Sequence, residues 1–96
     1  MDKPIIRIVY PIEGESYPVL QSDGLASSAY VTASLSITAA GGPHKVKWGF
    51  DDTPIGGATF YDQFSTQFVW DLPAGEHTLH VVCCKGGKEA VNFVIA

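Results

Sequence analysis

Apolar and more polar residues alternate along most of the chain with a period of two. The clearest case is the segment 29–39, where each parity carries one kind of side chain. The hydroxyl-bearing set is Tyr30, Thr32, Ser34, Ser36 and Thr38, and the apolar set is Val31, Ala33, Leu35, Ile37 and Ala39. Successive side chains of a strand point to opposite faces, so the segment is predicted to be a long strand with one buried face.

The same alternation predicts further strands at roughly 4–10, 17–20, 44–50, 58–61, 64–71, 76–85 and 88–95. Turn residues separate them, among them Gly41-Gly42-Pro43, Gly56-Gly57 and Gly86-Gly87. The last pair is predicted to form a two-residue type I′ hairpin turn between Lys85 and Lys88. The expected fold is all-β, an antiparallel two-sheet sandwich of the immunoglobulin-like or fibronectin-III-like kind with seven to eight strands.

The inward parity of these strands nominates the core, and a corner joins two of them. The predicted core residues are Ile8, Leu35, Trp48, Phe68, Trp70, Leu79, Val81 and Phe93. At the corner, Pro73 fixes φ and Gly75 permits a positive φ, so the chain can turn sharply. His77 has the same parity as the inward residues Leu79 and Val81. It therefore points toward the edge of the sandwich, where an imidazole can hydrogen-bond the backbone. The sequence thus predicts a structural role for His77.

Composition limits the classes of partner. The 96 residues are enough for one domain, spanning residues 1–96, and 46% hydrophobic residues provide for a core. The net charge of -4 comes without a cationic cluster, which argues against nucleic acid as the main partner. No segment is apolar for long enough to insert into a membrane as a helix. Cys83 and Cys84 are neighbours on a predicted strand and point apart, so a disulfide between them is not expected.

The sequence contains no motif for catalysis, for a cofactor or for a metal. His77 and His80 fall on opposite faces of one predicted strand and cannot chelate one ion together. The sequence has no Gly-x-Ser-x-Gly nucleophile elbow. None of its glycine pairs precedes a predicted helix, as a phosphate-binding loop would. Two carboxylate pairs, Glu13 with Glu15 and Asp51 with Asp52, are expected to cap turns or to be solvated, with a weak calcium site as the alternative. The chain is not expected to be an enzyme.

Aromatic residues outside the predicted core are the candidates for ligand binding. Tyr30 lies on the hydroxyl-rich parity, and the adjacent Phe60 and Tyr61 must diverge in an extended segment. Exposed aromatic rings can stack on sugars or anchor a protein partner. The alternative is that these rings pack over sheet edges.

Three stretches of the chain carry a resemblance to a known family. They are Ile6-Arg7-Ile8 with Pro11 and Gly14, Val46-Lys47-Trp48 followed by residues 51–56, and residues 70–79 with Pro73-Ala74-Gly75-Glu76-His77. In that order they resemble the small C-terminal domain of penicillin-binding protein 1C and, more broadly, bacterial immunoglobulin-like or fibronectin-like accessory modules. The resemblance implies a sandwich fold within a larger envelope protein and a link to peptidoglycan synthesis.

We therefore expect a non-catalytic interaction module of a bacterial envelope protein, periplasmic or extracellular, whose partner is a protein or an envelope polysaccharide. One alternative is a carbohydrate-binding module that uses exposed tyrosine or tryptophan. Another is a small free-standing structural or phage-type protein that self-associates through a strand edge. That protein would be cytoplasmic if Met1 is its natural start.

Overall fold

The computed structural model describes residues 4–19, 21–22 and 27–96, with the backbone alone at 21, 22 and 27. Met1 and Leu20, the end of the predicted strand 17–20, lie outside these residues. The elements are β1 (Ile5–Tyr10), β2 (Ser16–Tyr17), β3 (Gln21–Ser22), β4 (Ser27–Phe50), β5 (Thr53–Pro73), β6 (Gly75–Val82), the 3-10 turn η1 (Cys84–Gly86) and β7 (Lys88–Ile95). The described part of the chain is mostly β, as predicted, and contains no α-helix.

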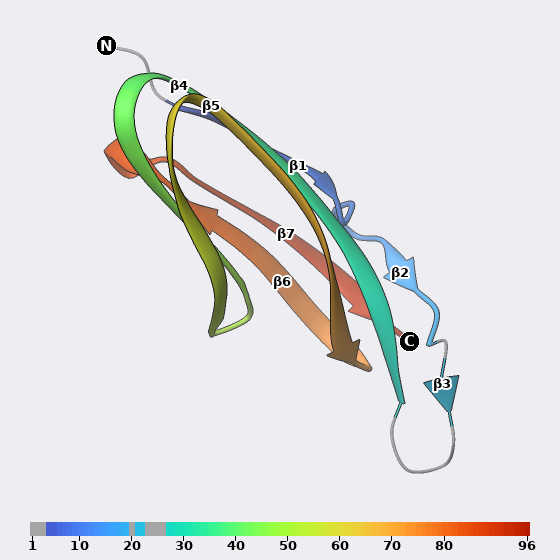
Figure 1. Cartoon of the computed structure of the whole chain (residues 1–96). Helices are drawn as coiled ribbons and strands as arrows, with labels where there is room; N and C mark the ends of the chain where they lie inside the picture. The colour runs from blue at the N-terminus through green and yellow to red at the C-terminus, as the bar shows by residue number, and fades with distance from the viewer. Residues whose placement is uncertain (1–3, 20, 23–26) are drawn as a thin grey trace.

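A long bent hairpin of β4 and β5 forms the frame of the molecule (Figure 1). Each strand has two arms, which are residues 27–39 and 44–50 in β4 and residues 53–60 and 63–73 in β5. Between its arms β4 bends at Gly41 and Gly42, whose φ angles are +81° and +135°, and the register shifts between Ala39 and His44. The sequence predicted four separate strands here, but at Gly41 and Gly42, where a break was expected, β4 bends and its ladder continues beyond them.

The two arms of β4 belong to different sets of paired strands. Its N-terminal arm pairs with β1 and with the C-terminal arm of β5. Its C-terminal arm pairs with the N-terminal arm of β5 and with β6, which in turn pairs with β7. The result is one hydrogen-bonded sheet that curls over on itself (Figure 1). The sheet is mixed, because the short β2 runs parallel to β7 while the other described pairs are antiparallel.

Side chains from both sets of strands enclose the core. One cluster surrounds Phe50 and Phe93, and the other surrounds Leu35 and Val81. Of the predicted core residues, Leu35, Leu79, Val81 and Phe93 are buried. Ile8, Trp48 and Phe68 are partly buried and pack against these clusters. Trp70 is 40% exposed, so its assignment to the core is wrong.

The hairpin between β6 and β7 exists, but its turn lies one residue earlier than predicted. β6 ends at Val82, and the Gly87 N–H donates to the Cys84 carbonyl at 3.0 Å. The two central residues are therefore Lys85 and Gly86, both with positive φ, as a type I′ turn requires. Gly87 is needed for another reason, because a Cβ there would clash with the ring of Pro4.

Candidate functional site

The three aromatic residues predicted to bind a ligand do not lie together. Tyr30 and Tyr61 are 63% and 64% exposed, but Tyr30 lies in the N-terminal arm of β4 and Tyr61 lies at the bend of β5. Phe60 is buried, so its assignment to a binding surface is wrong. Its ring packs on His44 and Phe64, with centroids 5.4 and 5.8 Å away. Phe60 and Tyr61 point apart, as neighbours in an extended chain do.

Tyr30 belongs to a polar surface, which we name the outer face. It is the outward side of β1, the N-terminal arm of β4 and the C-terminal arm of β5. Its rows across the strands are Ile5–Thr38–Gln63, Arg7–Ser36–Ser65, Tyr10–Ser34–Gln67, Thr32–Val69 and Tyr30–Asp71. Arg7 and Asp71 are the charged side chains in these rows, so hydroxyl and amide groups dominate the surface.

An apolar patch interrupts the polar rows of the outer face. Tyr10, Tyr30 and Val69 are 48%, 63% and 57% exposed and lie around Thr32. Val69 is directly opposite Thr32. Tyr30 is the diagonal neighbour of Val69 across the strands, within reach of a long side chain. Tyr10 faces outward because a bulge lies between Ile8 and Tyr10, which reverses the parity of β1. Strict alternation misses this reversal, so the sequence did not nominate Tyr10.

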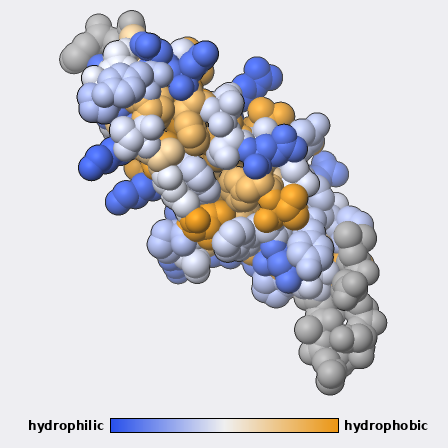
Figure 2. Space-filling model, viewed as in Figure 1, coloured by the Kyte–Doolittle hydropathy of each residue, from blue (hydrophilic) through white to orange (hydrophobic). Residues whose placement is uncertain are grey.

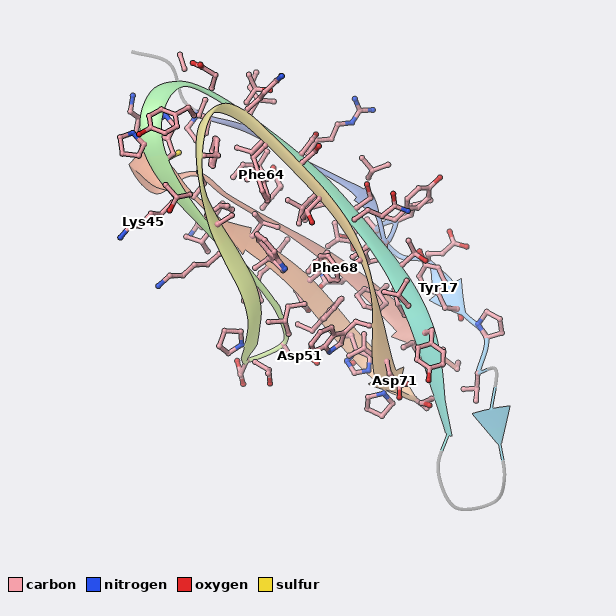
Figure 3. The ribbon with its side chains drawn as sticks, viewed as in Figure 1. Tyr17, Lys45, Asp51, Phe64, Phe68 and Asp71 are labelled. Carbon is pink, nitrogen blue, oxygen red and sulfur yellow. The ribbon has the colours of Figure 1, made fainter. Side chains whose placement is uncertain are left out.

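A second group of aromatic side chains lies between the two arms of β5. We name Trp48, Phe64 and Phe68 the aromatic seam, and Trp70 continues the same side of β5. Figure 3 shows Phe64 and Phe68 between the arms, and Figure 2 shows apolar surface in the same region. Trp70 has the inward parity of the two phenylalanines but remains 40% exposed. Its exposure follows from its strand, because among the described residues no strand lies beyond β5 in this layer.

Trp48 extends from the C-terminal arm of β4 to the C-terminal arm of β5 and forms the centre of the seam. Its indole stacks on Phe64 and Phe68, with centroid separations of 5.8 and 6.1 Å and interplanar angles of 27° and 22°. Gly56 is its cross-strand partner, and a Cβ at Gly56 would come within 2.7 Å of the indole. The pair Gly56-Gly57 was predicted to be a turn but lies inside β5. Glycine is present at position 56 to admit the ring of Trp48.

β5 also has a free edge. In the part of the chain that the structure describes, β5 pairs only with β4, along both arms. Residues 63–70 of the C-terminal arm read Gln-Phe-Ser-Thr-Gln-Phe-Val-Trp and contain no charge, no proline and no glycine. The backbone groups on the outer side of an edge strand have no partner within the sheet, so such a segment can pair with another chain.

The predicted corner forms and fastens the hairpin to β6. Pro73 ends β5, and Gly75 has a φ of +133°. His77 is buried, and its Nε2 lies 2.7 Å from the Pro73 carbonyl, which is the kind of backbone contact that the sequence predicted. Its Nδ1 lies 2.7 Å from Oδ2 of Asp51, at the tip of the hairpin (Figure 3).

Asp51 collects several contacts at this tip. Its Oδ1 accepts the Thr78 N–H at 3.0 Å, and its own carbonyl lies 2.7 Å from Nε2 of His80. Partial burial alone would raise the pKa of Asp51. The hydrogen bonds from His77 and the Thr78 N–H, together with the charges of His77 and His80, outweigh burial and hold the pKa below its ordinary value of 3.8. Asp51 therefore acts as a turn carboxylate that binds two strands together.

The other candidate chemical groups are held in structural contacts or stand alone. Oε1 of Glu13 accepts the Asn92 N–H at 3.1 Å, as a capping carboxylate does. Over the described ranges, no three His, Cys, Asp or Glu side chains gather closely enough to hold a metal ion. Cys83 and Cys84 are free thiols, and burial and the neighbouring Cys84 raise the pKa of Cys83 to about 11. Cys83 is thus protonated near neutral pH, which makes it a poor nucleophile.

A shallow hollow beside the corner offers no prepared ligand site. It measures about 350 Å³ and is lined by Glu13, Glu76, His77, Thr78 and Asn92, among others. Within the described part of the chain, every buried side-chain nitrogen or oxygen has a hydrogen-bond partner. No buried polar group is therefore left for a ligand to satisfy.

Comparison with models of known protein families and with curated proteins finds no match to this sequence. Among the residues with a described structure, no helix is long and apolar enough to cross a membrane. Function is therefore inferred from the surfaces of the molecule, which are the outer face, the aromatic seam and the free edge of β5.

Proposed function

We propose that the chain is a non-catalytic interaction module of the immunoglobulin-like kind and that it binds its partner through the outer face. The order of strand pairing supports this fold assignment. β1, the N-terminal arm of β4 and the C-terminal arm of β5 correspond to strands A, B and E of an immunoglobulin-like sandwich. The C-terminal arm of β4, β6 and β7 correspond to strands C, F and G of its second sheet.

The observation that carries the binding role is the apolar patch of the outer face. Tyr10, Tyr30 and Val69 expose about half of their surface or more on a sheet face that has few charges. Grouped apolar side chains surrounded by polar ones are typical of protein interaction sites. Tyrosine is suited to such contacts, because its ring buries a large area while its hydroxyl makes a hydrogen bond.

The partner proposed first is a protein surface, in an envelope protein of the kind that the resemblance to accessory modules implies. A face of three strands with few charges fits another neutral surface. The second candidate is an envelope polysaccharide. It is favoured by the hydroxyl and amide rows beside Tyr10 and Tyr30, since tyrosine rings stack on sugars and the rows provide hydrogen bonds.

The test compares two tyrosines of equal exposure. Tyr30→Ala removes a ring from the outer face, whereas Tyr61→Ala removes one at the bend of β5 and serves as the matched control. A photo-crosslinking residue at Thr32, introduced into each variant in the producing cell, should give a protein adduct that Tyr30→Ala loses and Tyr61→Ala keeps. Sedimentation with purified peptidoglycan should show the same dependence if the partner is the polysaccharide. Absence of both adduct and cosedimentation, or equal loss in both variants, would contradict the proposal.

A further inference from the structure

The C-terminal arm of β5 is an edge built without the usual protection against pairing. Natural edge strands carry prolines, inward charges, lysines or bulges that block the addition of another strand. Residues 63–70 contain none of these residue types, and their register with β4 is regular from Ser28↔Pro73 to Ala39↔Asp62. The flanking acids, Asp62 and Asp71, limit the unprotected stretch to these eight residues.

Apolar surface accompanies this edge on both sides of the sheet. Val69 is 57% exposed on the outer face, and Trp70 is 40% exposed on the side of the aromatic seam. A strand added to β5 would remove part of both side chains from water, which is favourable at about 25 cal/mol per Å² of apolar area. Backbone hydrogen bonds and apolar burial therefore favour the same contact.

We propose that this edge pairs with the same edge of a second copy of the chain, as two antiparallel strands related by a two-fold axis. In a two-fold contact the same patch serves on both partners, so it must be complementary to itself. An axis through Gln67 places Phe64 opposite Trp70 of the second copy and Thr66 opposite Phe68. Aromatic pairs across strands stabilise a sheet, so the pairing of Phe64 with Trp70 favours this register.

Charge does not block a second copy in this register. The chain has a net charge of -4, so two copies repel each other over most approaches. With the axis at Gln67, Asp71 lies opposite Gln63 and Asp62 lies opposite Leu72, so no acid faces another acid. The edge is thus a place where two copies can meet without repulsion between carboxylates directly opposite each other.

Pairing through one strand gives a modest interface, and we expect a weak dimer. Stable protein interfaces bury roughly 1,200 to 2,000 Å² in total, which exceeds what nine paired residues per copy provide. Sedimentation of the full chain should therefore show a monomer–dimer equilibrium in the submillimolar range. The contact would join the outer faces of the two copies into one wider face.

The test uses charge at the centre of the proposed contact. In Gln67→Lys or Gln67→Glu, two like charges face each other across the axis, which should raise the dissociation constant of the dimer about tenfold or more. An equimolar mixture of the two variants should restore association, because opposite charges then meet. Ser34→Lys is the matched control, since Ser34 lies directly opposite Gln67 on the same face but in the inner strand β4.

Three results would overturn the inference. They are a wild-type chain that stays monomeric at millimolar concentration, an equal response to Gln67→Lys and Ser34→Lys, and failure of the mixed charge variants to associate. Circular dichroism of each variant checks that the fold is retained, and Gln67→Asn provides an uncharged variant that should still dimerise. The inference does not depend on the proposed function, because sedimentation of the isolated chain involves neither protein partner nor polysaccharide.

Discussion

The two arms of β5 both have a free edge but differ in the residues that hinder the addition of another strand. The N-terminal arm contains Pro54, which lacks an N–H, and an irregular register at Ile55, where Pro54 pairs with Gly49 and Gly56 pairs with Trp48. Lys45 and Lys47 lie opposite Thr59 and Gly57 on the neighbouring inner strand β4, and Figure 3 shows Lys45 pointing outward. The C-terminal arm contains none of these features between Asp62 and Asp71.

Protection and packing go together in this strand. In the protected arm, Phe60 is 5% exposed and lies against His44 and Phe64. In the unprotected arm, Trp70 has the inward parity but is 40% exposed. The first arm carries features that hinder the addition of a strand at its edge, while the second leaves both backbone groups and an indole ring available to a partner.

Truncating one aromatic side chain in each arm should give the largest contrast. Phe60→Ala removes a buried ring and leaves a cavity, so the free energy of unfolding should fall by about 3 kcal/mol. Trp70→Ala removes a ring that is 40% exposed at the edge of the sheet and leaves no closed cavity, so the loss should be smaller, about 1 kcal/mol. Urea denaturation followed by circular dichroism measures both values. Equal losses in the two variants would contradict the claim that Phe60 is packed more tightly than Trp70.

A smaller effect should follow from closing the space that Trp48 occupies. Gly56→Ala places a methyl group against the indole, and overpacking of this kind destabilises by about 1 to 3 kcal/mol. Thr59→Ala, at an exposed position of the same arm, serves as the control and should change stability by about 0.5 kcal/mol or less.

A double-mutant cycle identifies the indole as the cause. Trp48→Phe shortens the ring, so its combination with Gly56→Ala should lose less stability than the sum of the two single variants. Additive losses would show that the methyl group meets the backbone rather than Trp48, and the indole would then not be the reason for glycine at position 56.

The sequence predicted the β class and most strand positions because a period of two marks a strand with one buried face, whatever its partners. The sequence-based prediction failed where glycine could mark either a turn or a position inside a paired strand. Gly56-Gly57 has the composition of a turn, but Gly56 is small because Trp48 lies over it. Gly41-Gly42-Pro43 does bend the chain, yet the pairing of β4 resumes beyond it at His44. Such outcomes depend on contacts across strands, which periodicity along one strand does not contain.

The binding surfaces were harder to predict than the core. Tyr30 was nominated because its parity is hydroxyl-rich, and it is indeed exposed. Trp70 was assigned to the core because it shares the parity of Phe68, but parity gives the direction of a side chain and not the presence of a covering strand. The signal that was available is the uncharged run 63–70, which is typical of an edge open to pairing once its strand is known to be an edge.

The smallest expected effect concerns how the N-terminal arm is fastened at its tip. Asp51 joins the β4–β5 turn to His77 and Thr78 of β6, and its pKa lies below 3.8. A carboxyl group whose pKa is lowered by folding contributes stability above its unfolded pKa, and that contribution is lost as the pH falls through the folded value. The free energy of unfolding should therefore decrease as the pH drops from about 5 to below 3.8.

Asp51→Asn isolates this contribution, because the amide keeps the shape of the side chain without its charge. Its unfolding free energy should be lower than that of the wild type at neutral pH, and the two should converge as the pH falls. Asp52→Asn changes the exposed neighbour in the same turn and should retain the wild-type dependence on pH. A wild-type slope in Asp51→Asn would mean that other carboxylates cause the acid loss. The tip would then be held by the backbone bond from Asp51 N–H to Thr78 and not by the carboxylate.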